Sequence, residues 1–176
     1  QAMRAELVGI SLAVQAGKAY YIPLGHSSES GVGPQLPLED VVQVLGPVLS
    51  DKGIVKVLHN AKYDMMVLSR YSLAIQGRVY DTMIAAWLLS PSGRGIGLKE
   101  QAWQRLGVEM TPIKQLIGSG RKQITMAHVS VARAAPYACA DADMTLRLLD
   151  VLRPELESRQ QWDLFTQMEM PLIPVL

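Results

Sequence analysis

The sequence contains little cysteine, little histidine and few aromatic residues for its length. Among 176 residues there is one Cys and one Phe, and aromatic residues make up 6%. A single cysteine, Cys139, cannot form a disulfide within the chain. The three histidines, His26, His59 and His128, lack the spacing of zinc ligands. These absences exclude a disulfide scaffold and a structural zinc site.

Long apolar runs are also missing. Stretches such as Leu7–Val14 are much shorter than the ~18 residues that cross a bilayer. No charged segment followed by an apolar one opens the chain, so we expect a cytoplasmic protein without a membrane partner. Apolar residues make up 49% and charged residues 19%. This composition predicts one folded domain, residues 1–176, with a core of its own.

The charge is distributed unevenly, although the net charge is only +1. Residues 1–51 carry a net charge of −3, residues 52–133 carry +8, and residues 134–176 carry −4. A basic middle segment suits a surface that binds a polyanion. Chance clustering on a solvated surface is the alternative.

Turn residues and hydrophobic spacing predict an alternation of strands and helices. The pattern favours an α/β or α+β arrangement around one central sheet. The predicted strands are Ala5–Val14 and Ala19–Leu24, forming a hairpin, and Ile54–Leu58. The predicted helices are Leu38–Leu49, Ala61–Arg70, Thr82–Leu89 with Asp81 as N-cap, Leu98–Leu106, one opened by Pro136 and running to about Pro154, and one from about Gln160 to Leu176.

One candidate site follows the third predicted strand. Asn60 stands where this strand ends and a helix begins, and Asp64 lies four residues further on, on the same helix face. The carboxyl end of a strand is where α/β proteins usually bind ligands. Alternatively, Asn60 caps the helix and Asp64 complements its dipole.

A second candidate site is the pair Tyr137 and Asp141, one helical turn apart and flanked by small residues. A carboxylate on a face that continues through apolar Leu148 requires a cation or a hydrogen-bond donor. Mg²⁺ prefers oxygen ligands, and phosphodiester hydrolysis uses two metal ions ~4 Å apart held by carboxylates. We therefore expect the Asp64 and Asp141 carboxylates to lie within roughly 4–8 Å of each other. Satisfaction of an aspartate by backbone amides is the alternative, and Asp143 fits it.

The segment Gly118–Lys122 is rich in glycine and basic residues but lacks the spacing of a phosphate-binding loop. Its composition is equally typical of a loop that contacts phosphate and of an ordinary solvated loop. Cys139 has no base nearby in the sequence, so we expect a small buried residue and not a nucleophile.

Several segments, in the same order and over nearly the whole chain, resemble the 3′–5′ exonuclease domain of bacterial DNA polymerase I, in the family A polymerases. The segments are Leu7–Ser11, Tyr21–Pro23, His59–Asp64, Asp81–Met83, Gly118–Thr125, Tyr137–Leu146 and Glu169–Leu176. The Asn-x-x-x-Asp and Tyr-x-x-x-Asp motifs also occur in other DEDD exonucleases, such as RNase D. The last segment is more particular to polymerase I.

The resemblance implies a ribonuclease H-like α/β fold, a mixed sheet flanked by helices. It implies Mg²⁺ or Mn²⁺ as cofactor, Asp64 and Asp141 as metal ligands, and Tyr137 as the residue that positions the attacking water. The frayed single-stranded 3′ end of DNA would be the substrate, and the polymerase domain of the same parent chain the partner. The implied substrate-binding residues are Asn60, His59, Ile113 as an apolar wedge, and Arg94, Arg121 and Lys122 as phosphate contacts.

One departure from the family pattern concerns the first motif, Asp-x-Glu, which is not in this sequence. We therefore expect a fragment of a longer polymerase chain, with its first strand truncated and no exonuclease turnover of its own. Two alternatives remain at this point. One is a catalytically dead exonuclease-like domain that supports structure or binds DNA, and the other is an RNase D-type RNA exonuclease.

Overall fold

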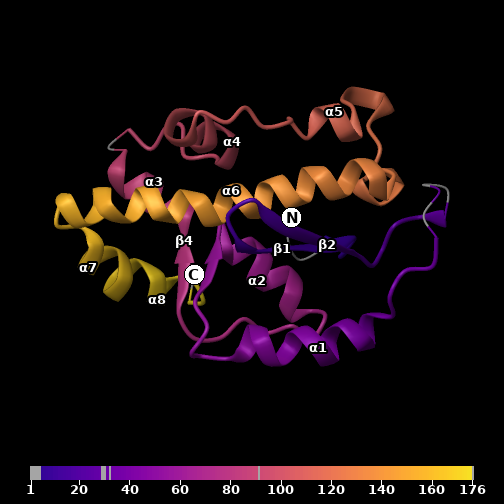
Figure 1. Ribbon diagram of the computed structural model, residues 1–176, viewed down its shortest axis with the longest axis horizontal. Helices are drawn as coiled ribbons and strands as arrows, with labels where there is room; N and C mark the ends of the chain where they lie inside the picture. The colour runs from indigo at the N-terminus through magenta and orange to yellow at the C-terminus, as the bar shows by residue number, and fades with distance from the viewer. Residues whose placement is uncertain (1–4, 29–30, 32, 91, 176) are drawn as a thin grey trace.

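The computed structural model describes residues 5–28, 31, 33–90 and 92–175 of the chain. Strands and helices alternate through the first half, and one long helix, α6 (Val131–Ser158), runs across the molecule (Figure 1). The predicted mixed α/β architecture is therefore confirmed. Within the described residues, no helix is both long and apolar enough to span a membrane.

The predicted hairpin is confirmed, with shorter strands. Strands β1 (Gly9–Gln15) and β2 (Lys18–Pro23) are antiparallel, with Ile10 opposite Ile22. The connecting turn uses Gly17 at φ +78°, a conformation that glycine adopts without strain. Gly9 lies under the Tyr21 ring, where a Cβ would come within 2.3 Å of the Tyr21 hydroxyl.

The second sheet is parallel and consists of β3 (Lys56–Leu58) and β4 (Val79–Asp81). Leu58 is opposite Asp81, so both strands end at the same edge. Strand β4 was not predicted, because three residues are too few to show a periodicity.

The expected single central sheet is replaced, among the described residues, by these two separate two-stranded sheets. Each pair of strands forms ladder hydrogen bonds only within itself. Helix α6 packs against β1, β2 and β3, and thereby joins the two sheets into one body (Figure 1).

Most of the remaining helices lie where helices were predicted, whereas α5 was not predicted from the sequence. They are α1 (Leu38–Ser50), α2 (Ala61–Ser69), α3 (Thr82–Leu89), α4 (Leu98–Gln101), α5 (Lys114–Ile117), α7 (Trp162–Leu164) and α8 (Met170–Leu172). Two π-helical segments, η3 (Ala102–Leu106) and η6 (Phe165–Glu169), continue α4 and α7, and the short 3₁₀ turns are η4 (Gly120–Lys122) and η5 (Met126–His128).

Helix α6 begins five residues before Pro136, the predicted start, and ends four residues after Pro154. Both prolines therefore lie inside the helix. The fully buried residues Leu148, Leu152 and Leu156 form its inner face, and their burial outweighs the missing hydrogen bonds of two prolines. The predicted final helix is wrong as one continuous element: it is divided into α7, η6 and α8, and its predicted last residue, Leu176, lies outside the described residues.

The main core lies between α6, α3 and the C-terminal helices. It combines Ala85, Ala86 and Leu148 with Phe165, which has no exposed surface. A second core cluster, formed by Ile10, Val41, Leu49 and Leu73, packs the hairpin against α1. The helices and strands of these two clusters thus fix the position of the edge where β3 and β4 end.

Candidate functional site

Asp81 organises the edge where the parallel strands end. Its carboxylate is 2% exposed and accepts hydrogen bonds from the backbone N–H groups of Asn60 (3.0 Å), Ala61 (2.7 Å) and Met83 (2.8 Å). One side chain therefore binds the first residues of both α2 and α3. The sequence predicted only its capping of α3.

Asn60 has a backbone conformation that is uncommon for any residue except glycine. Its φ and ψ are 69° and 52°, in the left-handed region, and its side chain forms no capping hydrogen bond to α2. The alternative in which the Asn60 side chain caps the helix is therefore excluded. Left-handed asparagine residues cluster at ligand sites, and this amide is exposed at the strand edge.

Asp64 lies on α2, in the turn that follows Asn60, and is only partly exposed. Burial, reinforced by the negative charge of Asp81, raises the pKa of Asp64 to about 6. Within the described part of the chain, no Lys or Arg pairs with this carboxylate. Among the residues that the structure describes, the Asp64 carboxylate thus has no positively charged partner.

His59 is directed toward the start of α3. Its Nδ1 lies 2.9 Å from the Thr82 hydroxyl, which in turn donates to the Leu58 carbonyl. Burial lowers the pKa of His59, and the negative charge of Asp81 partly opposes this effect. These contacts give His59 a role in the local packing, and its predicted contact with substrate stays a prediction.

Tyr137 and Asp141 face each other across one turn of α6. Burial, then the charge and hydrogen bond of Asp141, raise the pKa of Tyr137 to about 12, so the phenol is protonated at neutral pH. Burial also raises the pKa of Asp141, and this shift is opposed by Lys99 and by the hydrogen bond from Tyr137.

Lys99, from α4, is the residue of this site that the sequence analysis missed. Its Nζ donates to Asp141 Oδ1 at 3.1 Å and lies 4.3 Å from the centre of the Tyr137 ring. Lys99 and Asp141 are 42 residues apart, so no local spacing could have indicated the contact.

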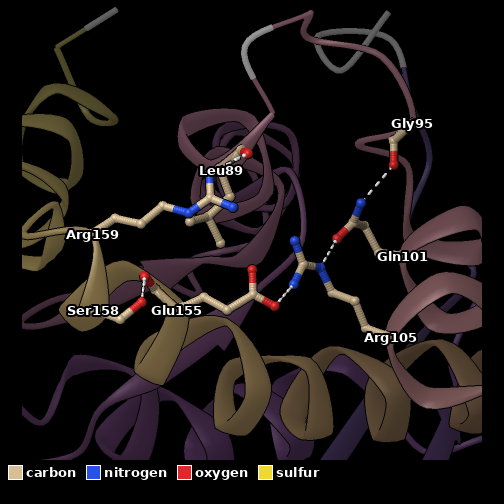
Figure 2. Close-up of polar contacts among 7 residues, drawn as sticks. All are labelled: Leu89, Gly95, Gln101, Arg105, Glu155, Ser158 and Arg159. Atoms are coloured by element: carbon tan, nitrogen blue, oxygen red, sulfur yellow. Dashed lines mark hydrogen bonds and ion pairs between the residues drawn. The ribbon is translucent and has the colours of Figure 1, made fainter.

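A polar network holds the α4–η3 segment, which carries Lys99, against α6 (Figure 2). Arg105 donates to Gln101 at 2.6 Å and is paired with Glu155 of α6. Gln101, 3% exposed, donates to the Gly95 carbonyl at 2.7 Å. The network therefore also fixes one end of the loop that carries Arg94.

A cavity of about 130 Å³ opens beside Tyr137 and Asp141. Its other lining residues come from α6, from α5 and from the segment that leads into α5: Met110, Thr111, Leu116, Arg133, Pro136 and Ala140. Ile113 stands in that segment between two lining residues and is 42% exposed. The predicted wedge residue thus lies on the segment that forms the cavity wall.

The predicted phosphate contacts are all exposed. Arg94 lies in the loop before α4, and Arg121 and Lys122 lie in η4, after α5. The loop before α4 and the segment after α5 stand at opposite ends of the layer above α6 (Figure 1). A strand of nucleic acid that contacts all three must therefore follow the length of this layer.

Asp143 is held by a backbone amide, as the sequence predicted, whereas Cys139 is only partly buried and not buried as expected. The Asp143 carboxylate accepts a hydrogen bond from Gly17 N–H at 2.6 Å and lies 3.7 Å from Arg147. It therefore fixes the hairpin turn to α6. Burial raises the pKa of the Cys139 thiol, which disfavours a nucleophilic thiolate.

The described residues include no group of three or more His, Cys, Asp or Glu side chains arranged to hold a metal. The chemistry of Asp64 and Asp141 nevertheless fits a divalent cation, because both are desolvated oxygen donors with raised pKa values. No described Lys or Arg pairs with Asp64, whereas Asp141 is paired with the Lys99 ammonium.

Comparison with known proteins gives a consistent result. A family model described as 3′-5′ exonuclease matches residues 1–157. DNA polymerase I of Chloroflexus aurantiacus is 44% identical over 100% of this chain and 18% of its own length. DNA polymerase I of Pseudomonas aeruginosa is 39% identical over 99% of this chain and 19% of its own length. The chain thus spans about a fifth of the length of these relatives.

Among solved structures, Brucella melitensis NrnC has the same fold. Its form with bound Mg²⁺ superimposes with a TM-score of 0.72 at 22% identity, over 99% of this chain and 76% of that chain. Its form bound to pGG gives a TM-score of 0.73 at 22% identity, over the same shares. The ribonuclease H-like fold class is thereby confirmed. From the family match and the two polymerase relatives, we conclude that this chain belongs to the 3′–5′ exonuclease domain family of bacterial DNA polymerase I.

Proposed function

We propose that this chain is the proofreading domain of a DNA polymerase I and hydrolyses the 3′-terminal phosphodiester of mismatched DNA. The observation that carries the proposal is the Tyr137–Asp141 pair, partly buried at the wall of a cavity, in a chain 44% identical to a DNA polymerase I. Its substrate would be a single-stranded 3′ end, and its partner the polymerase domain of the same chain.

In this proposal Asp64 and Asp141 hold Mg²⁺ or Mn²⁺. When bound, two such ions neutralise the charge that develops on the attacking and leaving oxygens of the phosphodiester. The Mg²⁺-bound form of NrnC supports this choice of cofactor.

The other residues act on water and on the nucleotide. The protonated Tyr137 hydroxyl orients the attacking water, because its pKa of about 12 keeps the proton on the phenol. The exposed Asn60 amide and the Ile113 side chain position the terminal nucleotide. Arg94, Arg121 and Lys122 contact phosphates, which fix position without reading sequence.

We further propose that the chain alone has no turnover. The two carboxylates that the proposal assigns to the metals carry a formal charge of −2, and two divalent ions carry +4. Mg²⁺ gives up its water reluctantly and requires well-placed oxygens, so one weakly bound ion is expected. Robust, chelator-sensitive release of nucleotides from an oligonucleotide by this chain would contradict this part of the proposal.

The test of the function uses a DNA polymerase I chain that contains this sequence. Asp141→Ala should abolish release of mismatched 3′ nucleotides and leave polymerisation unchanged. Asp150→Ala is the matched control, because Asp150 is exposed on the same helix. Retained proofreading in the Asp141 variant would refute the assignment.

This chain shares its fold with NrnC, which has been solved bound to pGG. This likeness favours a second candidate function, that of an RNA exonuclease of the RNase D type. The two candidates differ in substrate. The proofreading proposal predicts faster hydrolysis of a DNA oligonucleotide than of the RNA oligonucleotide of the same sequence. The reverse order would favour the RNA exonuclease.

A further inference from the structure

We propose that Lys99 is a built-in counter-ion of Asp141 that a divalent cation must displace. Metal binding at Asp141 is then an exchange of one cation for another, and it releases the Lys99 ammonium from the Tyr137 ring. This inference rests on the proposed function, because it concerns the same carboxylate.

The contacts of Lys99 place its ammonium on the carboxylate oxygen that a metal ion would bind. The Nζ atom lies 3.1 Å from Asp141 Oδ1 and 4.3 Å from the Tyr137 ring centre. A divalent ion bound to the same carboxylate would stand within a few ångströms of the ammonium. Because like charges at that separation repel strongly in a partly desolvated site, the two cations compete for Asp141.

The ion pair is weak enough to be exchanged. Both side chains are 31% exposed, and ion pairs that are open to solvent contribute little to stability. The Lys99 ammonium stands on a flexible four-carbon chain, so it can move while the backbone of α4 stays fixed. Gln101 and Arg105 hold the backbone of this segment in place.

A purely structural role for Lys99, as a link between α4 and α6, makes a different prediction. Loss of a structural link would lower stability and leave the affinity for metal unchanged or weaker. Exchange predicts that loss of the ammonium makes the affinity for metal tighter. The sign of the change in affinity therefore separates the two roles.

The experiment measures Mn²⁺ binding to this chain by the electron paramagnetic resonance signal of free Mn²⁺. Lys99→Met should bind Mn²⁺ about 3- to 10-fold more tightly than the unsubstituted chain. Lys52→Met, which removes an exposed lysine before β3, is the control for the general loss of one positive charge. Lys99→Arg keeps the charge and should bind Mn²⁺ no more tightly than the unsubstituted chain.

The Asp141→Asn background shows whether the effect acts through Asp141. There, Lys99→Met should no longer increase the affinity, since the contested carboxylate is absent. A second readout is the NMR signal of the Tyr137 ring, which Mg²⁺ should shift toward its position in Lys99→Met. This shift does not depend on any enzymatic activity.

The outcomes separate the inference from the proposed function. Mn²⁺ binding that depends on Asp141, with equal or lower affinity in Lys99→Met than in Lys52→Met, would overturn the inference and leave the proposed function intact. If neither the unsubstituted chain nor Lys99→Met binds Mn²⁺ in a way that depends on Asp141, the inference and the proposed metal site are both overturned.

Discussion

At the scale of single residues, the Asp64 carboxylate is largely buried, and no Lys or Arg among the described residues pairs with it. Its pKa is about 6 in the folded chain against an ordinary value of 3.8, so the folded state binds its proton more tightly than the unfolded state does. Stability from this group is therefore complete below about pH 4 and is lost as the pH rises through 6.

Asp64→Asn should accordingly stabilise the fold at pH 7 by about 1–3 kcal/mol, because each pKa unit corresponds to ~1.4 kcal/mol. At pH 4 the variant and the unsubstituted chain should differ little. Urea denaturation at both pH values measures the two differences. A loss of stability at pH 7, or a difference that does not vary with pH, would show that Asp64 is compensated in the fold.

Tyr137 and Asp141 should differ in how much activity depends on them. In a polymerase I chain containing this sequence, Asp141→Ala should remove exonuclease activity, because Ala offers no ligand. Tyr137→Phe keeps the ring and loses only the hydroxyl, so a smaller decrease is expected, of about 10²- to 10⁴-fold. Measured rates of 3′ nucleotide release compare the two. Equal losses would assign Tyr137 a structural role.

The sequence predicts the site residues that contact neighbours a few positions away, and misses those that contact residues far along the chain. Asn60 with Asp64, and Tyr137 with Asp141, are pairs four residues apart, and the structure places each pair on one helix or at its start. Lys99 reaches Asp141 from 42 residues away, and Asp81 reaches Asn60 from 21 residues away. Such contacts form only when the strands and helices pack, so sequence spacing cannot show them.

At the scale of helices and strands, Asp81 connects two helix N-termini to the end of β4. Asp81→Ala would leave the N–H groups of Asn60, Ala61 and Met83 without their acceptor in a buried place. We expect a loss of about 2–4 kcal/mol in the free energy of unfolding. Thermal or urea denaturation measures it, with Asp150→Ala as a control that should change stability by less than about 0.5 kcal/mol. A loss as small as that of the control would contradict this role of Asp81.

Helices with a long apolar stripe were predicted with nearly the right bounds. The predictions were wrong where tertiary packing determines where a strand or helix begins and ends. The apolar stripe of α1 predicted Leu38–Leu49, and the helix is Leu38–Ser50. Strand β4 has three residues and exists because it pairs with β3. The prolines of α6 suggested boundaries at positions 136 and 154, yet the buried leucines of this helix extend it past both.

At the scale of the whole molecule, the basic middle segment predicts salt-dependent binding of nucleic acid. Affinity for single-stranded DNA should fall steeply as salt is added, through release of counter-ions. The double variant Arg121→Glu, Lys122→Glu should weaken binding for all sequences alike and flatten the salt dependence by about 1.4 in log–log slope, at ~0.7 per contact. Fluorescence anisotropy with labelled oligonucleotides measures both effects.

The control for this measurement is the double variant Lys52→Glu, Arg78→Glu, in two exposed residues near β3 and β4. It changes the net charge by the same amount away from η4. Equal weakening by the two double variants would show that only the total charge matters, and would remove Arg121 and Lys122 from the path of the DNA.

Asp64 and Asp141 share one metal-dependent site in the function proposed for this chain. The most direct measurement is the anomalous scattering of Mn²⁺ in crystals of this chain soaked in the metal. We expect one Mn²⁺ peak in contact with carboxylate oxygens of both residues, since this chain alone is expected to hold one ion. Mn²⁺ bound away from both carboxylates, or the two carboxylates on opposite sides of the fold, would contradict it.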